Sequence, residues 1–325
     1  MGTVLASGYH GPPKLTVIRA LTEWTFDPWM LALIVVLGVA YLAGVARVRR
    51  AGSPWPAARP IWFCGVGLGF LVIATMSWVG AYQAILFYAR AVQTVLLVLL
   101  VPLFLALGRP ITLAITALPR ARARIEAVIG SFPARVLTFP AITTLTLVGV
   151  PFMMYFTSWY TAVFHSGTVR ELTYLVLMAP GFAFFWTLLR VDPVPKQYPY
   201  VVSMWITGAE VIGDAFFGIA VIADQNLLGA SYYHALAWPW GPSLATDQVI
   251  GGGVLWILGD LVGLPFLAAQ LMQLMHEDES DAARIDAELD AEQAASATQG
   301  VADEAAGTRL WWEEDPRFTD RFKPT

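Results

Sequence analysis

Cysteine and charge are both scarce in this sequence, and each shortage excludes a class of protein. The single cysteine, Cys64, excludes an intramolecular disulfide and any Cys-x-x-Cys metal or redox motif. Charged residues make up 14% of the 325 residues, whereas hydrophobic residues make up 57%. Soluble domains carry about 25% charged residues, so this chain needs a surface that faces lipid. We interpret it as a polytopic membrane protein.

Long apolar runs divide the sequence into membrane spans, each close to the roughly 20 residues that a helix needs to cross the hydrocarbon. We predict seven of them, at about 28–47, 60–79, 83–107, 136–157, 168–190, 198–223 and 248–275. The expected fold is therefore all-α, a bundle of seven transmembrane helices. Residues 1–27 would form an extracytoplasmic lead-in, residues 28–275 the membrane domain, and residues 276–325 an acidic cytoplasmic tail.

Lysine and arginine are absent from alternate loops, and this asymmetry predicts how the chain is oriented. The loops without either residue are 80–82, 158–167 and 224–246. The loops that contain them are 47–59, 108–135 and 190–197. Because basic loops stay in the cytoplasm, we expect the N-terminus outside and the C-terminus inside a cell membrane. The N-terminus lacks a basic region followed by a short apolar core, so we expect no cleaved signal peptide.

Two hydrophilic segments carry predictions of their own. The 108–135 loop mixes Leu, Ile and Ala with arginines at helical spacing, which predicts an amphipathic helix lying on anionic headgroups. The net charge of −4 arises because acidic residues collect in the tail from Glu277 onward. For this tail we expect a short charged helix followed by a disordered linker.

Ionisable residues inside the predicted spans are a strong functional signal, because charge in lipid needs a partner. At 1.5 Å per residue, Arg90 lies about 10–12 Å and Asp214 about 15 Å below the outer surface, with Glu210 one turn deeper. We therefore expect Arg90 to face Asp214 or Glu210. The predicted buried polar cluster is Arg90, Thr94, Arg170, Glu171, Tyr174, Glu210, Asp214, Asp247, Gln248 and Asp260. Either a stabilising ion pair or a site for a ligand, ion or partner would explain it.

Several segments resemble the CtaG family of cytochrome c oxidase assembly proteins, especially its actinobacterial members. They are "LFYARAVQTVLLVLLVPLFLALGRPITL", "VRELTYLVLMAPGFAFFWTLLRVDPVP", "ATDQVIGGGVLWILGD" and "DPRFTDRF". Their order and spacing are preserved from about residue 10 to the end. The resemblance implies a role in delivering or inserting copper while a respiratory-chain oxidase matures at the outer face of the membrane.

The sequence departs from this family at its histidines. The family carries a His-x-x-x-His pair on the third span and another that opens the fifth. The corresponding positions here are Arg90 with Thr94, and Arg170 with Tyr174. Arginine has no acceptor lone pair, and threonine and tyrosine are poor ligands for soft Cu(I). We therefore expect no metal at these positions, and a fixed guanidinium at Arg90 in place of the family's metal cation.

The histidines that remain give weak candidates for copper. His10, His165 and His234 fall on the predicted outer side, with methionines such as Met154 near outer span ends. A His/Met set would suit copper, but these histidines are isolated, which favours ordinary surface or loop residues. The sequence thus predicts no cofactor of its own, and copper is a candidate only through the family resemblance.

The sequence best supports an assembly or accessory protein of cytochrome c oxidase that works by binding and is not an enzyme. We expect membrane lipid and either oxidase subunits or a copper chaperone as partners, and no nucleic acid. One alternative is a transporter or channel lined by the buried charges, although no broken spans or internal repeat support it. Others are a permanent structural subunit of a respiratory complex, and a haem or quinone oxidoreductase that lacks deep histidines.

Overall fold

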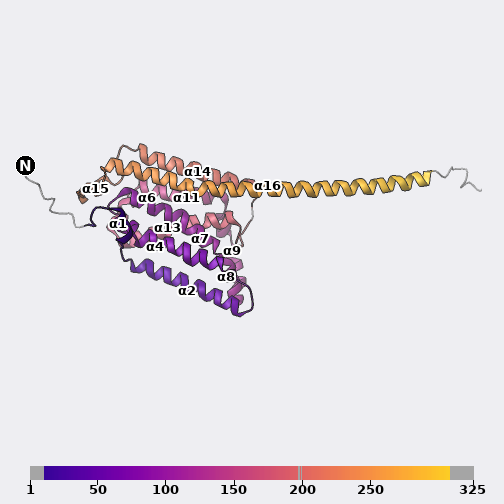
Figure 1. The fold of residues 1–325 in the computed structure, drawn as a ribbon, viewed down its shortest axis with the longest axis horizontal. Helices are drawn as coiled ribbons and strands as arrows, with labels where there is room; N and C mark the ends of the chain where they lie inside the picture. Colours follow the sequence, from indigo (N-terminus) through magenta and orange to yellow (C-terminus); the bar gives the residue numbers. More distant parts are fainter. Residues whose placement is uncertain (1–10, 197, 199, 308–325) are drawn as a thin grey trace, which may run out of the picture. The chain divides into compact units, whose positions relative to one another are not determined.

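The computed structural model describes residues 11–196, 198 and 200–307, and every regular element in these ranges is a helix (Figure 1). Two compact units divide the chain, Met1–Gln270 and Leu271–Thr325. The helices of the first half are α1 (Val17–Thr22), α2 (Pro28–Arg50), α3 (Ala58–Pro60), η1 (Ile61–Gly67), α4 (Leu68–Met76), α5 (Trp78–Tyr82), α6 (Phe87–Val95), η2 (Leu96–Leu100), α7 (Val101–Leu107) and α8 (Pro110–Ala117). Those that follow are η3 (Pro119–Ala121), α9 (Arg122–Ile129), α10 (Phe132–Leu137), α11 (Pro140–Phe156), α12 (Trp159–His165), α13 (Gly167–Leu189), α14 (Tyr200–Ala223), α15 (Ala230–Leu236) and α16 (Leu244–Gly307).

Six helical stretches in the described residues are long and apolar enough to cross a membrane, and a bent pair adds a seventh if it forms one span. The six are Pro28–Arg50, Ala58–Tyr82, Phe87–Ala117, Gly167–Leu189, Val201–Ala223 and Leu244–Met272. The bent pair is α11 with α12, which meet at 70° across a short break. The predicted helical membrane fold is confirmed, with six spans or up to seven. The orientation of its termini stays a prediction.

The third stretch, which begins with α6, is the most deeply packed of the six, since it buries the largest share of its residues. Its middle part, η2 and α7, packs against α13. The crossing is so close that a Cβ on Gly181 would overlap the carbonyl oxygen of Val98. Glycine lets helix backbones approach in this way, and the contact fixes α13 beside the helix that carries Arg90.

The 108–135 loop forms three short α-helices and a single 3₁₀ turn, where the sequence predicted one amphipathic helix. Pro119 follows the end of α8, and Gly130 follows the end of α9. Pro133 then starts a new turn inside α10, with Ser131 capping it through the backbone N–H of Ala134. Proline removes a backbone donor and fits best in the first turn of a helix, so these residues break the amphipathic run into pieces.

Helix α16 continues without interruption from the last candidate span to Gly307, and this corrects the expectation of a disordered linker. Its second part, in the unit that begins at Leu271, is rich in alanine, glutamate, aspartate and glutamine. Most of these residues favour helix. Their helix propensity outweighs the repulsion among acidic side chains, which was the reason for predicting a disordered linker. The aromatic segment around Trp311 and Trp312 lies outside the described residues.

Candidate functional site

Helix α6 begins at a carboxylate supplied by a distant part of the chain. Asp247, in the first turn of α16, accepts hydrogen bonds from the backbone N–H groups of Phe87 (2.8 Å) and Tyr88 (3.0 Å). The first N–H groups of a helix need such acceptors, and a negative charge suits this end of the helix dipole. One turn further along, the same helix places Arg90 in the interior of the bundle.

The guanidinium of Arg90 is fully buried and contacts neutral acceptors. Its Nη1 donates to Oε1 of Gln83 and to Oε1 of Gln93, each at 2.7 Å. Its Nη2 donates to the sulfur of Met154 at 3.4 Å. The remaining nitrogen, Nε, has no hydrogen-bond partner among the described residues. A permanent cation is thus held by two amide oxygens and a thioether.

The two glutamine amides are oriented by bonds on their other side. Nε2 of Gln83 donates to the carbonyl of Gly80 (3.3 Å) and to the hydroxyl of Tyr174 (2.6 Å). Nε2 of Gln93 donates to the carbonyl of Ala74 (2.7 Å) and to the same hydroxyl (3.3 Å). Because each NH₂ group is occupied, each amide oxygen points at the cation.

Threonine at the second family histidine position completes the surroundings of Arg90. Thr94 Oγ1 donates to the backbone carbonyl of Arg90 (2.9 Å) and shares a hydrogen bond with the hydroxyl of Tyr155 (3.1 Å). We call the whole set the Arg90 network. Its members are Gln83, Arg90, Gln93, Thr94, Met154, Tyr155 and Tyr174.

The expected ion pair between Arg90 and an acid of the sixth span does not form. The ion pairs found among the described residues are Arg122–Glu126 and Arg170–Glu171. The acids of α14 face α16 instead: a Cβ on Gly259 would overlap the Asp214 carboxylate, and one on Gly263 would lie 3.0 Å from Oε2 of Glu210. The sequence matched the depths of Arg90 and these acids but could not give the direction in which α14 presents them.

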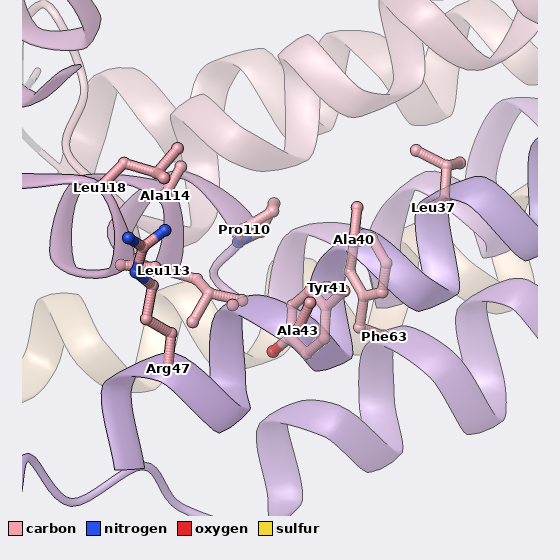
Figure 2. A pocket seen from close by; sticks show the side chains of 12 residues that line it. Leu37, Ala40, Tyr41, Ala43, Arg47, Phe63, Pro110, Leu113, Ala114 and Leu118 are labelled. Carbon is pink, nitrogen blue, oxygen red and sulfur yellow. The ribbon is translucent and has the colours of Figure 1, made fainter. Parts of the chain in front are cut away.

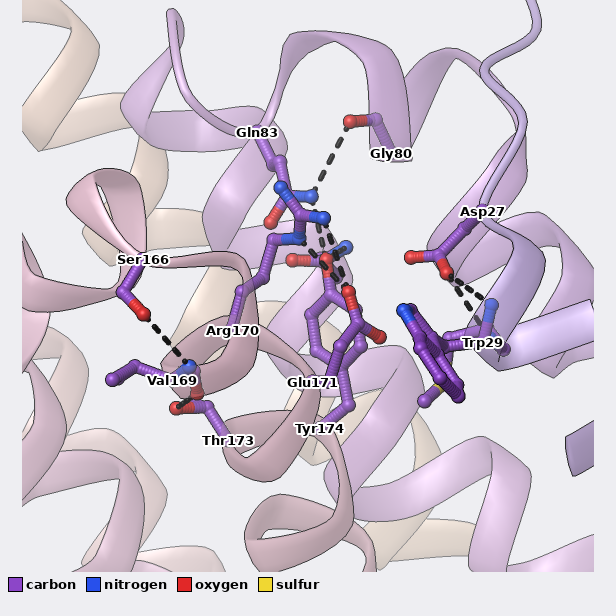
Figure 3. Close-up of polar contacts among 12 residues, drawn as sticks. Asp27, Trp29, Gly80, Gln83, Ser166, Val169, Arg170, Glu171, Thr173 and Tyr174 are labelled. Atoms are coloured by element: carbon purple, nitrogen blue, oxygen red, sulfur yellow. Dashed lines mark hydrogen bonds and ion pairs between the residues drawn. The ribbon is translucent and has the colours of Figure 1, made fainter.

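A second group of charges lies at the start of α13 and adjoins the Arg90 network. Arg170 donates from Nε (3.2 Å) and Nη2 (3.0 Å) to Oε1 of Glu171. Asp27, which caps α2, interacts with the same carboxyl group (Figure 3). Tyr174 follows Arg170 by one helical turn and reaches Gln83. A chain of polar groups therefore leads from the partly exposed Arg170 to the buried Arg90.

Gln248 ties together helix ends and is not part of a charged site. Its Nε2 donates to the carbonyls of Val221 (2.9 Å) and Asp224 (3.0 Å) at the end of α14. Its Oε1 accepts from the N–H of Leu228 at 2.8 Å, in the connection to α15. Together with its neighbour Asp247, this side chain joins α16 to two other helices at one end of the bundle.

The three remaining acids form a separate group between α14 and α16. Glu210 is 2% exposed, and its Oε2 has no hydrogen-bond partner in the ranges that the structure covers. Asp214 and Asp260 interact electrostatically with it, and Asp260 Oδ1 is also without a partner there. The predicted single cluster is therefore four groups: the Arg90 network, the Arg170 group, the helix clamp of Asp247 with Gln248, and this acidic group.

The isolated histidines stay apart in the structure. The ring of His165 on α12 packs edge-on against the ring of Tyr232, with 5.7 Å between the ring centroids. His234 on α15 is exposed. His10 lies outside the described residues. Within the described ranges, no three His, Cys, Asp or Glu side chains gather closely enough to hold a metal ion.

Sequence reasoning missed the residues that hold Arg90. Gln83 and Gln93 are uncharged, and Met154 was considered only as a copper ligand of an outer His/Met set. One signal was present, because a glutamine in an apolar span also needs partners. Gln93 follows Arg90 by three residues, which places both on one side of the helix.

The chemistry of the Arg90 network does not fit a copper ion at the family's third-span position. A guanidinium offers donors only, and here it fills the space between Gln83, Gln93 and Met154. Copper(I) prefers sulfur and imidazole ligands. The one soft donor at this position, the sulfur of Met154, already accepts a hydrogen bond from Arg90.

Comparison with known proteins identifies relatives over most of the chain. Residues 39–277 match the family described as cytochrome c oxidase caa3 assembly factor (Caa3_CtaG). An uncharacterized protein of Mycobacterium leprae is 30% identical over 292 residues, which are 87% of this chain and 44% of that protein. Uncharacterized proteins of Mycobacterium bovis and Mycobacterium tuberculosis are each 32% identical over 296 residues, 88% of this chain and 44% of theirs.

The chain spans less than half the length of these mycobacterial relatives. No solved structure matches it. The family match covers the spans that carry the Arg90 network, the Arg170 group and the helix clamp. The chain belongs to the family of cytochrome c oxidase caa3 assembly factors.

Proposed function

We propose that this protein assists the maturation of cytochrome c oxidase in the plasma membrane by holding an oxidase subunit or a copper-delivery partner. In this proposal it does not itself carry copper at the position of the family's third-span histidine pair, and it is not an enzyme. The observation that supports it is the fully buried guanidinium of Arg90, bound to Gln83, Gln93 and Met154.

Arg90 supplies one fixed positive charge at the position where other members of the family would hold a metal cation with their third-span histidine pair. A buried charge is destabilising unless hydrogen bonds compensate it, and here the two glutamine oxygens and the Met154 sulfur do so. The network joins α6 to the α5–α6 connection, to α11 and to α13. These links between helices support the proposal that the protein is a rigid scaffold for binding partners. In this proposal, copper transfer does not use the Arg90 position.

Family membership favours assembly over the transporter alternative. The acids that suggested a transport path lie between α14 and α16 and are not continuous with Arg90. The partly exposed Arg170, with Glu171 beside it, is the part of the polar chain that a partner could reach. We place the partner contact at this end of α13.

Deleting the gene and measuring haem a absorbance and oxidase activity tests the proposed role. We expect both to fall, and to recover when the intact gene is returned. The purified protein should contain well below one equivalent of copper after exposure to Cu(I). An unchanged oxidase in the deletion strain would overturn the assembly role. Copper near one equivalent, lost on changing Arg90 or Arg170, would overturn the metal-free interpretation.

Two substitutions separate partner contact from scaffold stability. Arg170→Ala removes the partly exposed charge, and we expect it to lower oxidase maturation without lowering the amount of folded protein. Lys196→Ala, which removes another charge from a connection between spans, is the control and should leave maturation unchanged. Equal maturation by both variants would contradict a partner contact at Arg170.

A further inference from the structure

A groove lies between α2 and α8. The two helices pack against each other, and α8 lies beside the C-terminal part of α2 (Figure 1). The volume of the groove is about 400 Å³, within the range of about 300–1,000 Å³ typical of small-molecule pockets. We call it the α2–α8 groove. Its main apolar lining residues are Leu37, Ala40, Gly44, Leu113, Ala114 and Ala117.

The groove is hollow because small residues face each other across it. Ala40 and Ala43 of α2 and Ala114 of α8 line this space (Figure 2). Gly44 and Ala117 also belong to its lining. The two helices also come close, since a Cβ on Gly44 would lie 3.2 Å from the Leu113 side chain. Leucine or phenylalanine at the alanine positions would fill the space. With alanine there, the groove stays open to a hydrocarbon ligand.

The floor of the groove is preformed. The rings of Tyr41 and Phe63 stack with centroids 4.1 Å apart. The hydroxyl of Tyr41 donates to the carbonyl of Gly108 at 2.6 Å, so it is occupied within the protein. The groove therefore presents almost pure hydrocarbon to its contents along most of its length.

A positively charged side chain, that of Arg47, lies at one end of this apolar groove. Arg47 is the charged residue of its lining, and its exposed guanidinium lies beside Ala114 and Leu118 (Figure 2). The side chain of Arg47 makes no hydrogen bond or ion pair among the residues that the structure describes. Arg59 lies 4.3 Å above the ring of Trp55 near the same helix end.

One acid, Asp192, lies near these arginines and is held by the start of α8. Asp192 uses Oδ2 to accept from the N–H of Ile111 (3.1 Å) and Oδ1 to accept from the N–H of Thr112 (2.9 Å). These bonds fix the carboxylate at the start of α8. Arg109 repels Arg59, whereas Asp192 attracts it. Arg47, which lines the groove and has no ion-pair partner among the described residues, is the cation that can attract an anion there.

We propose that the α2–α8 groove binds one acyl chain of an anionic phospholipid whose phosphate meets Arg47. The alkyl lining suits a lipid tail, and basic pockets between transmembrane helices bind anionic headgroups. A neutral lipid would fill the apolar part but leave the guanidinium without its anion.

Lipid retention by the purified full-length chain tests this site. The protein would be exchanged into detergent with equal amounts of dioleoylphosphatidylglycerol and dioleoylphosphatidylcholine, and bound lipid counted by native mass spectrometry. We expect the wild-type chain to retain the anionic lipid preferentially. Arg47→Ala should lower that preference about fivefold, the effect of one basic residue near an anionic headgroup, and leave retention of the neutral lipid unchanged.

Two further variants keep the result decisive. Arg50 is an exposed arginine at the same end of α2, but it does not line the groove. Arg50→Ala should therefore behave as wild type. Ala114→Phe fills the groove and should lower retention of both lipids. Equal retention of the two lipids by the wild-type chain would overturn the proposal. So would equal losses in Arg47→Ala and Arg50→Ala, since these would reflect general surface charge.

Discussion

Arg90 and Gln93 lie one turn apart on α6, and Nη1 of the arginine donates to the side-chain oxygen of the glutamine at 2.7 Å. The glutamine is itself fixed by its bond to the Ala74 carbonyl. The buried cation is therefore compensated by oriented dipoles and not by an opposite charge. Removing an acid elsewhere in the bundle should not rescue a change at Arg90.

Replacing Arg90 should reveal whether its charge or its volume matters more for stability. Arg90→Ala leaves a cavity and two unpaired amide oxygens, so we expect a loss of about 3–5 kcal/mol in the free energy of unfolding. Arg90→Met restores most of the volume and should be clearly more stable than Arg90→Ala. Thermal unfolding in detergent, with the yield of folded protein, measures this. Equal midpoints for the two variants would contradict a role for volume.

Gln93 should be sensitive to shape and tolerant of added negative charge. Gln93→Leu removes an acceptor from the buried cation, and we expect a loss of about 1.5–3 kcal/mol, the range for hydrogen bonds to charged groups. Gln93→Glu keeps an oxygen beside Arg90 and supplies an opposite charge, so it should be less destabilising than the leucine variant. Thermal unfolding of the two proteins side by side decides the order. The reverse order would show that the hydrogen bond from Gln93 to the Ala74 carbonyl, which glutamate cannot donate, contributes more than the added charge beside Arg90.

Restoring the family's histidine pair should create a copper site. The double variant Arg90→His with Thr94→His places two imidazoles at i and i+4 on one face of α6, near the sulfur of Met154, which contacts Arg90 in the native chain. These are ligands that Cu(I) prefers. We expect copper to approach one equivalent in the double variant and to stay low in the single variant Arg90→His, as measured by metal analysis after gel filtration. No gain in the double variant would show that copper binding needs more than this pair.

Two glycines provide a matched test of the crossing between α13 and the third span. Gly181→Ala forces a Cβ into the Val98 carbonyl, and overpacking of this kind typically costs about 1–3 kcal/mol. Gly149→Ala in α11 meets no atom within 4 Å, and replacing a helical glycine by alanine gains up to about 1 kcal/mol. We therefore expect opposite shifts in the unfolding midpoint. A stabilised Gly181→Ala would mean that the crossing is looser than the structure places it.

Hydropathy was sufficient to predict the six long apolar helices, because the cost of unpaired backbone groups in lipid forces each long apolar run into a helix. It could not predict the 70° bend between α11 and α12, which depends on a break at Thr157 and Ser158. At that break the N–H of Trp159 donates to the hydroxyl of Thr157 at 3.3 Å. Such local side-chain bonds compete with helix and leave little trace in average hydropathy.

The buried position of Arg90 was also predictable, whereas its partners were not. Depth along a span follows from counting residues, but facing depends on how neighbouring helices rotate and pack. Asp214 has a suitable depth and turns instead toward Gly259. The residues that do reach Arg90 come from the α5–α6 connection, from α6 itself and from α11. Neutral glutamines gave no charge signal, so sequence reasoning favoured the acids.

The clamp made by Asp247 and Gln248 has a consequence for biogenesis. The amides of Phe87 and Tyr88 receive their acceptor from a residue 160 and 159 positions later in the chain. While the ribosome is still synthesising the segments between them, the first N–H groups of α6 have no Asp247 carboxylate to accept their hydrogen bonds. That end of the bundle can close only after the start of α16 has been inserted, so this closure follows the insertion of the helices between α6 and α16.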